Sequence, residues 1–346
     1  MSPIRTVPPT RMFEEAAQAA GVVRTQLERN KVALATLGAR LRLAPPRAVV
    51  TCARGSSDHA ATYAKYLIEA RTGVLTSSAA PSVSSIYEAH GDMRGVLFIA
   101  ISQSGKSPDL VTTTRAAKEG GATVVALCNT PDAPLMRLAD VAVPLHAGAE
   151  TSVAATKSYI ASLSAIAQLL ACWTDDQDLL RALKETPDLL ARAWDCDWSP
   201  VAETLCGAVN LFVLARGFGL GIAQEAALKL KETCGLHAEG FSSAEVKHGP
   251  MALVRAGFPV LMFTQSDDTR AGIAELAAEF AARGARVLLA GAQARGALTL
   301  PTVASHPVIE PLLAIQSFYR AANDLALARG LDPDTPPHLN KVTETI

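Results

Sequence analysis

Short runs of apolar residues recur along the chain, and longer stretches with apolar positions at helical spacing separate them. Two of these runs read VLFIAI and ATVVALCN, without polar positions in the alternation of a half-exposed strand. Strands that are apolar on both sides are typical of parallel sheets covered by helices on both faces. The pattern therefore predicts an α/β fold with three layers in each domain.

The second half of the chain repeats the first. Ala-Arg-Gly occurs at 53–55 and again at 215–217, and Gln-Ser occurs at 103–104 and again at 265–266, so both pairs lie 162 residues apart. Each copy reads as strand, turn, long helix, second strand, Gln-Ser turn, second helix and third strand. The repeat predicts two tandem doubly wound domains with parallel sheets, at 45–193 and 194–330.

Helical segments flank and join the two predicted domains. An N-terminal segment at 1–44 contains a predicted helix from about 12 to 43, and a helical stretch from 157 to about 193 joins the domains. Pro187 is expected to interrupt that stretch, because proline lacks the N–H that a helix uses. After a last helix at 311–329 comes Gly-Leu-Asp-Pro-Asp-Thr-Pro-Pro, which cannot be helical. We expect this tail, at 331–346, to fold over the active site.

Composition and charge exclude several classes of protein. The 346 residues carry a formal net charge of -1, which gives no electrostatic footprint for nucleic acid or for an anionic membrane surface. No stretch has the length and character of a signal peptide or a membrane span. The six cysteines form no CxxC pair, so we expect reduced thiols rather than disulfides or a zinc site. We predict a cytoplasmic protein without a metal or a cofactor.

Hydroxyl side chains gather where two predicted strands end. In open parallel sheets, ligands bind beyond the carboxyl ends of the strands, where the N-termini of helices attract anions. One strand is followed by Gly55 and two serines; the next is followed by a loop with a glycine and a proline that starts a helix. We predict a phosphate site there, formed by Ser56, Ser57, Ser102, Gln103, Ser104 and Ser107. The alternative is that Ser104 and Ser107 only cap the helix.

The corresponding loop of the second half predicts the opposite. It reads Ser-Asp-Asp-Thr at 266–269, and two carboxylates would repel an anion.

Two other motifs give weaker evidence for a nucleotide-binding site. The AxxxxGKS at 100–107 begins inside a strand and leaves too short a loop to wrap a triphosphate. The glycines at 217, 219 and 221 depart from a dinucleotide fingerprint by one residue, so we favour helix-to-strand packing for them.

Three charged residues share one face of the helix EAALKLKETCGL. Glu225, Lys229 and Glu232 lie at i, i+4 and i+7, and the rest of the helix is largely apolar. Carboxylates held near apolar surface tend to have raised pKa values, which suits proton transfer near neutral pH. The alternative is a solvated stripe of charge.

Several segments resemble the sugar isomerase (SIS) family, most closely the isomerase half of glucosamine-6-phosphate synthases. They read SQSG at 102, VAATKSY at 153, EAALKLKE at 225, HAEGFSSAEVKHGP at 237 and HLNKVTE at 338, in the order and spacing of that family. The resemblance spans residues from about 12 to 346. It implies that Glu232 shuttles a proton between C1 and C2 of a sugar, supported by Glu225 and Lys229. It also implies that Lys341 forms a Schiff base with the open-chain ketose.

The resemblance implies further roles and a subunit arrangement. His248 would open the sugar ring and would reach the site of the neighbouring subunit in a homodimer. Val153 and Ala155 would contact the sugar through backbone groups; the alternative is that they only start the helix that follows. The chain reaches the isomerase unit within a few residues of Met1, and we therefore expect no glutaminase domain and no internal source of ammonia.

Within the family, two positions depart from the synthase pattern: Lys106 stands in place of glutamate and Ala155 in place of serine. The resemblance favours a glucosamine-6-phosphate deaminase of the second type, which forms fructose 6-phosphate and ammonia. The alternatives are a fructosamine-phosphate deglycase, a ketose–aldose phosphosugar isomerase and, from another class, a non-catalytic phosphosugar sensor.

Overall fold

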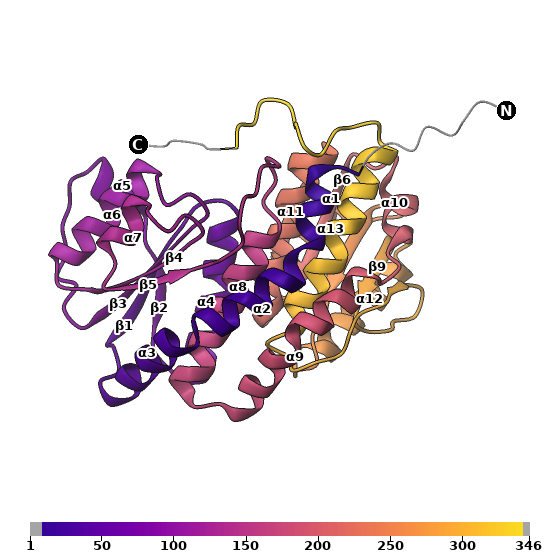
Figure 1. The fold of residues 1–346 in the computed structure, drawn as a ribbon. Coiled ribbons are helices and arrows are strands. Elements are labelled where there is room, and N and C mark those ends of the chain that lie inside the picture. The colour runs from indigo at the N-terminus through magenta and orange to yellow at the C-terminus, as the bar shows by residue number, and fades with distance from the viewer. Residues whose placement is uncertain (1–8, 342–346) are drawn as a thin grey trace.

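Two parallel five-stranded sheets organise the computed structural model, which describes residues 9–341 (Figure 1). The first sheet has the order β2-β1-β3-β4-β5 and the second the order β7-β6-β8-β9-β10. Every strand pair is parallel. The strands are β1 (Ala48–Cys52), β2 (Thr76–Ser78), β3 (Val96–Ser102), β4 (Thr123–Cys128), β5 (Val141–Pro144), β6 (Asn210–Ala215), β7 (His237–Ser242), β8 (Pro259–Phe263), β9 (Arg286–Ala290) and β10 (Leu298–Leu300).

Helices cover both faces of the sheets and fill the space between them (Figure 1). The predicted α/β class with two tandem parallel sheets is confirmed. The helices are α1 (Arg11–Ala17), α2 (Ala19–Arg29), α3 (Lys31–Leu43), α4 (Ser56–Thr72), α5 (Pro81–Ser85), α6 (Pro108–Glu119), α7 (Pro134–Leu138), α8 (Lys157–Thr174), α9 (Gln177–Trp194), α10 (Ser199–Leu205), α11 (Leu220–Cys234), α12 (Arg270–Ala282) and α13 (Glu310–Ala328).

The internal repeat holds at the level of single elements. Strand β6 begins 162 residues after β1, and α12 begins 162 residues after α6, which is the spacing found in the sequence. All residues of the central strands β3 and β8 are buried, as expected for strands with helices on both faces. The predicted domain boundaries remain predictions, and residues 1–8 and 342–346 of the outer two segments lie outside the described residues.

Three local expectations were wrong. The N-terminal stretch is three successive helices rather than one, with breaks at Gln18 and Asn30. The stretch joining the two sheets breaks at Asp175, which adopts a left-handed φ of 54° and ends α8. Pro187 lies buried inside the continuous helix α9. A proline removes only one main-chain hydrogen bond there, and the apolar ring gains a buried position.

The two sheets are joined through a helix pair at their interface. Helices α4 and α11 pack so closely that a Cβ on Gly221 would lie 2.5 Å from the carbonyl oxygen of His59. A Cβ on Gly219 would lie 2.8 Å from Gln265 Oε1 and 3.1 Å from Ala215 Cβ, so Gly219 faces the loop after β8 as well as the end of β6, whereas Gly221 serves this helix-to-helix contact. The close approach brings residues of α11 next to the first sheet.

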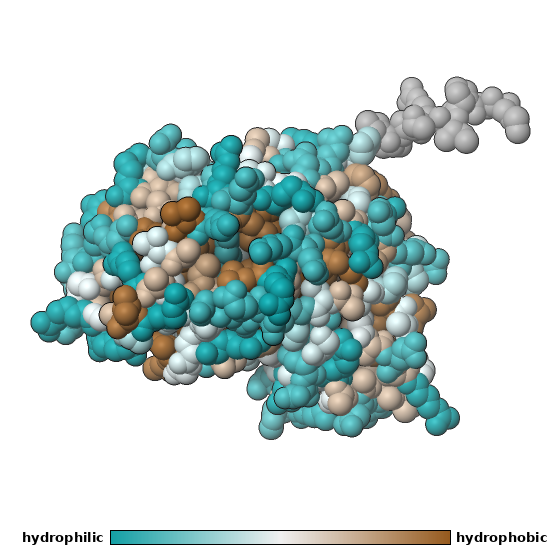
Figure 2. Space-filling model, turned by 60° about the horizontal axis from the view of Figure 1, so that its bottom comes forward, coloured by the Kyte–Doolittle hydropathy of each residue, from teal (hydrophilic) through white to brown (hydrophobic). Residues whose placement is uncertain are grey.

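Hydrophilic and apolar residues are unevenly distributed over the face of the molecule that Figure 2 presents. Figure 2 shows hydrophilic residues over most of the face that it presents, with apolar residues gathered in patches between them. Among residues 9–341, no helix combines the length and the apolar character needed to cross a bilayer.

Candidate active site

A cavity of about 360 Å³ opens beyond the carboxyl ends of β1 and β3, between which the strand order of the first sheet reverses. Residues from both halves and from the C-terminal tail line it. They are Arg54, Gly55, Ser56, Ser57, Ile101, Ser102, Gln103, Ser104, Ser107, Leu110, Val153, Ala155, Glu232, Leu339, Asn340 and Lys341. All the residues that the sequence assigned to the phosphate and the sugar are therefore in one cavity, together with Glu232 and Lys341.

The loop after β3 is held open by its own hydrogen bonds. The Ser102 hydroxyl accepts a hydrogen bond from the Gly105 N–H at 2.9 Å. Gly105 has a φ of +64°, and a Cβ there would lie 2.6 Å from both Ala133 Cβ and Cys128 Sγ, so only glycine fits. Ser107 is the N-cap residue of α6, but its side chain makes no cap hydrogen bond. The Ser107 hydroxyl therefore does not cap α6, which was the alternative to phosphate binding. Ser107 lines the cavity instead.

The second half fills the corresponding loop with its own carboxylate. Asp267 accepts hydrogen bonds from the Thr269 N–H at 2.9 Å and from the Gln265 amide at 2.9 Å. The Thr269 N–H and the Gln265 amide, which could otherwise donate to a bound anion, therefore already donate to Asp267. These bonds support the expectation that this loop does not hold phosphate, which stays a prediction.

The three charged residues of α11 form one connected group. Lys229 is buried, with a side chain 1% exposed, and its ammonium lies 3.5 Å from Glu225 Oε1 and donates a hydrogen bond to Glu232 Oε2. Glu225 is fully buried, whereas Glu232 is 20% exposed and faces the cavity. The alternative of a solvated stripe is excluded by this burial.

The surroundings of Glu225 favour its ionised form. Burial alone would raise the pKa of Glu225, but the Lys229 ammonium and hydrogen bonds from His59 and Ser56 lower it overall. Tyr319 adds a hydrogen bond from its hydroxyl at 3.2 Å. The expectation of a raised pKa was therefore wrong for this carboxylate, because four donors surround it.

Lys229 stays charged for the complementary reason. Burial favours the neutral amine, but Glu225 and Glu232 outweigh it, and the pKa of Lys229 is raised. Its ammonium fixes the Glu232 carboxylate at the cavity wall.

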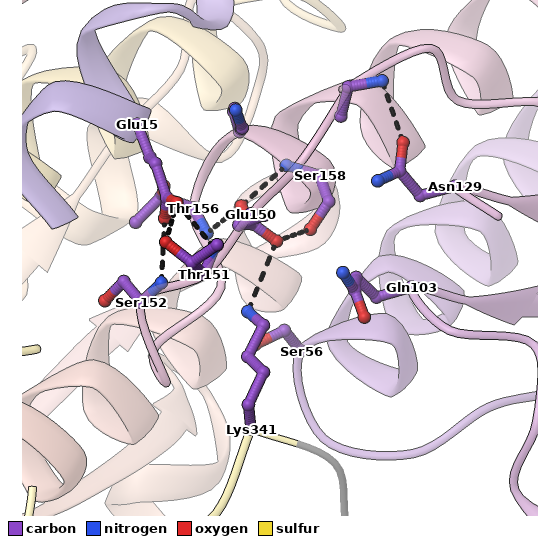
Figure 3. A network of polar contacts seen from close by, with 12 residues as sticks. Glu15, Ser56, Gln103, Asn129, Glu150, Thr151, Ser152, Thr156, Ser158 and Lys341 are labelled. Atoms are coloured by element: carbon purple, nitrogen blue, oxygen red, sulfur yellow. Dashed lines mark hydrogen bonds and ion pairs between the residues drawn. The ribbon is translucent and has the colours of Figure 1, made fainter. Parts of the chain in front are cut away.

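Lys341 brings an amine from the tail into the cavity. Figure 3 shows its side chain directed toward Glu150, and the Lys341 Nζ to Glu150 Oε2 distance is 3.7 Å. Burial is the main cause that lowers the pKa of Lys341, although Glu150 acts in the opposite direction. A lowered pKa increases the fraction of neutral amine near pH 7, which is the nucleophilic form.

The loop that carries Val153 and Ala155 is fixed by two buried carboxylates (Figure 3). Glu150 accepts hydrogen bonds from the N–H groups of Thr156 and Ser158 at 2.9 and 3.2 Å. Glu15, on α1, accepts hydrogen bonds from the N–H and hydroxyl of Thr151. The backbone groups expected to contact the sugar are thereby held in one conformation.

His248 lies apart from the cavity. It ends the short helix η2 (Glu245–His248), where it is exposed, and it is not among the residues that line the site. Its contribution to a neighbouring subunit stays a prediction. Within 9–341 there is no cluster of His, Cys, Asp and Glu suited to a metal ion.

Sequence reasoning did not assign several residues of the site. Arg54 and Asn340 line the cavity, Glu150 meets Lys341, and His59 and Tyr319 hold Glu225. Arg54 had a signal, because it belongs to the repeated Ala-Arg-Gly. Asn340 also had one, because it belongs to the HLNKVTE segment, whereas His59 and Tyr319 reach Glu225 from distant parts of the chain and no local pattern marks them.

The two parallel sheets and the cavity at the strand-order reversal of the first sheet define the class of the protein as a doubled α/β fold. The SIS domain family model matches residues 42–172 and 204–293, and the chain belongs to this family.

Two solved structures are similar over nearly the whole chain. A presumed phosphosugar isomerase from Silicibacter pomeroyi DSS-3 has 44% identity and a TM-score of 0.90, covering 94% of this chain and 100% of that one. The C-terminal domain of glucosamine-fructose-6-phosphate aminotransferase from Francisella tularensis has 26% identity and a TM-score of 0.85, covering 96% and 99%.

Among curated relatives, the isomerizing glutamine–fructose-6-phosphate aminotransferase of Leifsonia xyli subsp. xyli is 34% identical over 277 residues. That alignment covers 71% of this chain and 44% of the relative. The chain spans about half the length of the curated relatives it matches.

Proposed function

We propose that this protein is a phosphosugar isomerase that acts on an amino-sugar phosphate and converts glucosamine 6-phosphate to fructose 6-phosphate and ammonia. One observation carries the proposal: a hydroxyl-rich anion loop, the carboxylate of Glu232 and the amine of Lys341 line the same cavity. The names of the similar structures, a phosphosugar isomerase and an aminotransferase of fructose 6-phosphate, support the same substrate class. The cavity volume suits a small ligand.

Each step of the reaction has a residue with suitable chemistry. The loop at 102–107 and the turn at 55–57 would hold the phosphate. Glu232 would take the proton from C2 of the open-chain amino sugar and return it to C1, and Lys229 keeps its carboxylate in place. A second proton passes from the amine nitrogen to O1, and the resulting imine at C2 takes up water and releases ammonia. Lys341 would add to the C2 carbonyl of the ketose as a neutral amine and form a Schiff base with loss of water.

Other activities use part of the same set. A ketose–aldose isomerase needs only the phosphate grip and the carboxylate of Glu232. A fructosamine-phosphate deglycase needs the same proton transfer between C1 and C2 in a ketose whose C1 carries a substituted amine, which then leaves after water is added. A non-catalytic sensor needs the phosphate-binding loops, but it does not need a buried lysine that holds Glu232 in place.

A substrate panel tests the proposal. The protein is mixed with glucosamine 6-phosphate, fructose 6-phosphate and a phosphorylated fructosamine, and ammonia and sugar products are followed. Glu232→Gln should reduce turnover by about 100-fold or more while leaving substrate binding intact. Turnover that survives this substitution, or no turnover of any panel member by folded protein, would contradict the assignment.

The homodimer and the role of His248 have a separate test. We expect Glu232→Gln and His248→Asn proteins to be inactive alone. If His248 serves the partner's site, co-refolding the two would restore roughly a quarter of the activity, because half of the dimers are mixed and each mixed dimer has one intact site. A monomeric mass in solution, or no recovery on mixing, would reject this arrangement.

A further inference from the structure

An arginine and a buried aspartate form a pair beside the phosphate loop. Arg54 follows strand β1, lines the cavity and has a side chain that is 50% exposed. Asp109, in the first turn of α6, has a side chain with no exposure. Arg54 donates two hydrogen bonds to Asp109 Oδ2, from Nε at 3.0 Å and from Nη2 at 2.8 Å. The pair thus ties the turn after β1 to the helix after β3.

The internal repeat shows that the fold does not require this pair. Arg216 is the counterpart of Arg54 in the second half, and its side chain is exposed. The counterpart of Asp109, 162 residues later, is Ala271, which has no carboxylate. The second half forms its strand, turn and helix without the pair. The aspartate therefore accompanies the crevice that is open to an anion, and it is absent from the crevice that is filled.

Charge explains why the two residues occur together. A carboxylate at the N-terminus of α6 would by itself repel a phosphate bound at the same helix end. Arg54 neutralises it and uses one edge of the guanidinium to do so. The remaining edge of the guanidinium carries further N–H donors, and an arginine fork matches the oxygens of a phosphate.

We propose that Arg54 is a cationic ligand of the substrate phosphate and that Asp109 is the residue that positions it. The inference rests on the proposed function for the identity of the sugar, but the anion itself does not depend on it. Serine hydroxyls and backbone N–H groups give geometry to the phosphate site, and Arg54 supplies the full positive charge. The pair makes the site selective for phosphorylated over unphosphorylated sugars.

Binding of inorganic phosphate to the full chain, measured by calorimetry at low salt, tests the proposal without turnover. Arg54→Gln should weaken phosphate binding by about 10- to 100-fold, the range of a charge-assisted hydrogen bond. Arg54→Lys should be intermediate, since it keeps the charge and loses the fork. Arg216→Gln, the matched exposed arginine of the second half, should bind phosphate within about twofold of wild type.

A kinetic split separates recognition from support of the fold. With glucosamine 6-phosphate, Arg54→Gln should raise KM by a similar factor and change kcat little. Asp109→Asn should also raise KM, and Arg54→Lys should recover part of the loss. If Arg54→Gln is folded and binds phosphate as well as wild type, the inference is wrong. If it is unstable while Arg54→Lys binds phosphate normally, the pair is structural and the inference is equally rejected.

The two proposals can fail separately. No turnover of any sugar phosphate combined with weaker phosphate binding by Arg54→Gln would reject the proposed function and leave the assignment of Arg54 standing. Binding of unphosphorylated sugars is the last measurement, and Arg54→Gln should not change it.

Discussion

Replacing Lys229 with Met should destabilise the protein strongly, because it leaves a buried carboxylate without its cation. Removing one partner of a buried ion pair typically costs about 3–5 kcal/mol. Glu225 keeps hydrogen bonds from Ser56, His59 and Tyr319, at 3.0, 2.9 and 3.2 Å, so we expect the lower end, about 3 kcal/mol. Glu232 loses the donor that holds it, so kcat should fall as well.

The assay is unfolding in guanidinium chloride at pH 7, followed by circular dichroism. Lys231→Met is the matched control, since Lys231 is exposed on the same helix and should change the free energy of unfolding by no more than about 0.5 kcal/mol. The double variant Glu225→Gln/Lys229→Met removes the orphaned charge and should regain much of the lost stability. Equal effects of Lys229→Met and Lys231→Met would refute the view that Lys229 compensates buried charge.

Three further predictions follow from the site. Gly105→Ala should lower stability by about 1–3 kcal/mol and weaken phosphate binding, because its Cβ would overlap two neighbours, whereas Gly21→Ala, with open space around it, should do neither. Borohydride should trap fructose 6-phosphate on Lys341, and mass spectrometry would measure the adduct. Because the pKa of Lys341 is lowered, trapping should rise with pH and become half-maximal below the usual lysine pKa of about 10.4. The adduct should be absent in Lys341→Gln. The lowered pKa of Glu225 contributes stability that is present above its ordinary value of about 4.3 and lost as the pH falls through the folded value, so Glu225→Gln should flatten the acid limb of unfolding.

The sequence predicted the elements whose apolar residues recur at regular spacing, and it was less successful where tertiary packing determines where a helix ends. Apolar strands at repeated spacing determined the class and the two sheets, because burial on both faces leaves few polar positions. Helix breaks were less predictable. Pro187 has a strong local preference against helix, but packing keeps α9 continuous, while Asp175 ends α8 by a left-handed conformation that several residue types could adopt.

The residues predicted near strand ends line one cavity, and their roles stay predictions, whereas contacts across the chain could not be predicted. The serines and Gln103 follow from the rule that parallel sheets bind ligands at the carboxyl ends of strands. Glu15 fixes the loop at 150–156 from 136 residues away, and no periodicity reports such a contact. The pKa of Glu225 is lowered first by Lys229 on the same helix and then by His59 and Ser56 on α4, and the sequence does not show that these two residues of α4 lie beside it.

The two halves of the molecule share one fold but differ in the loop after their central strand. In the first half the loop after the second central strand is open, and in the second half Asp267 occupies it. Helix α11 belongs to the second half, yet it presents Glu232 to the cavity of the first, because Gly221 lets it approach α4 closely. Ser56 on α4 donates a hydrogen bond to Glu225 across this contact at 3.0 Å. The site therefore depends on the packing between the domains as much as on either domain, since neither supplies both the anion loop and the carboxylate.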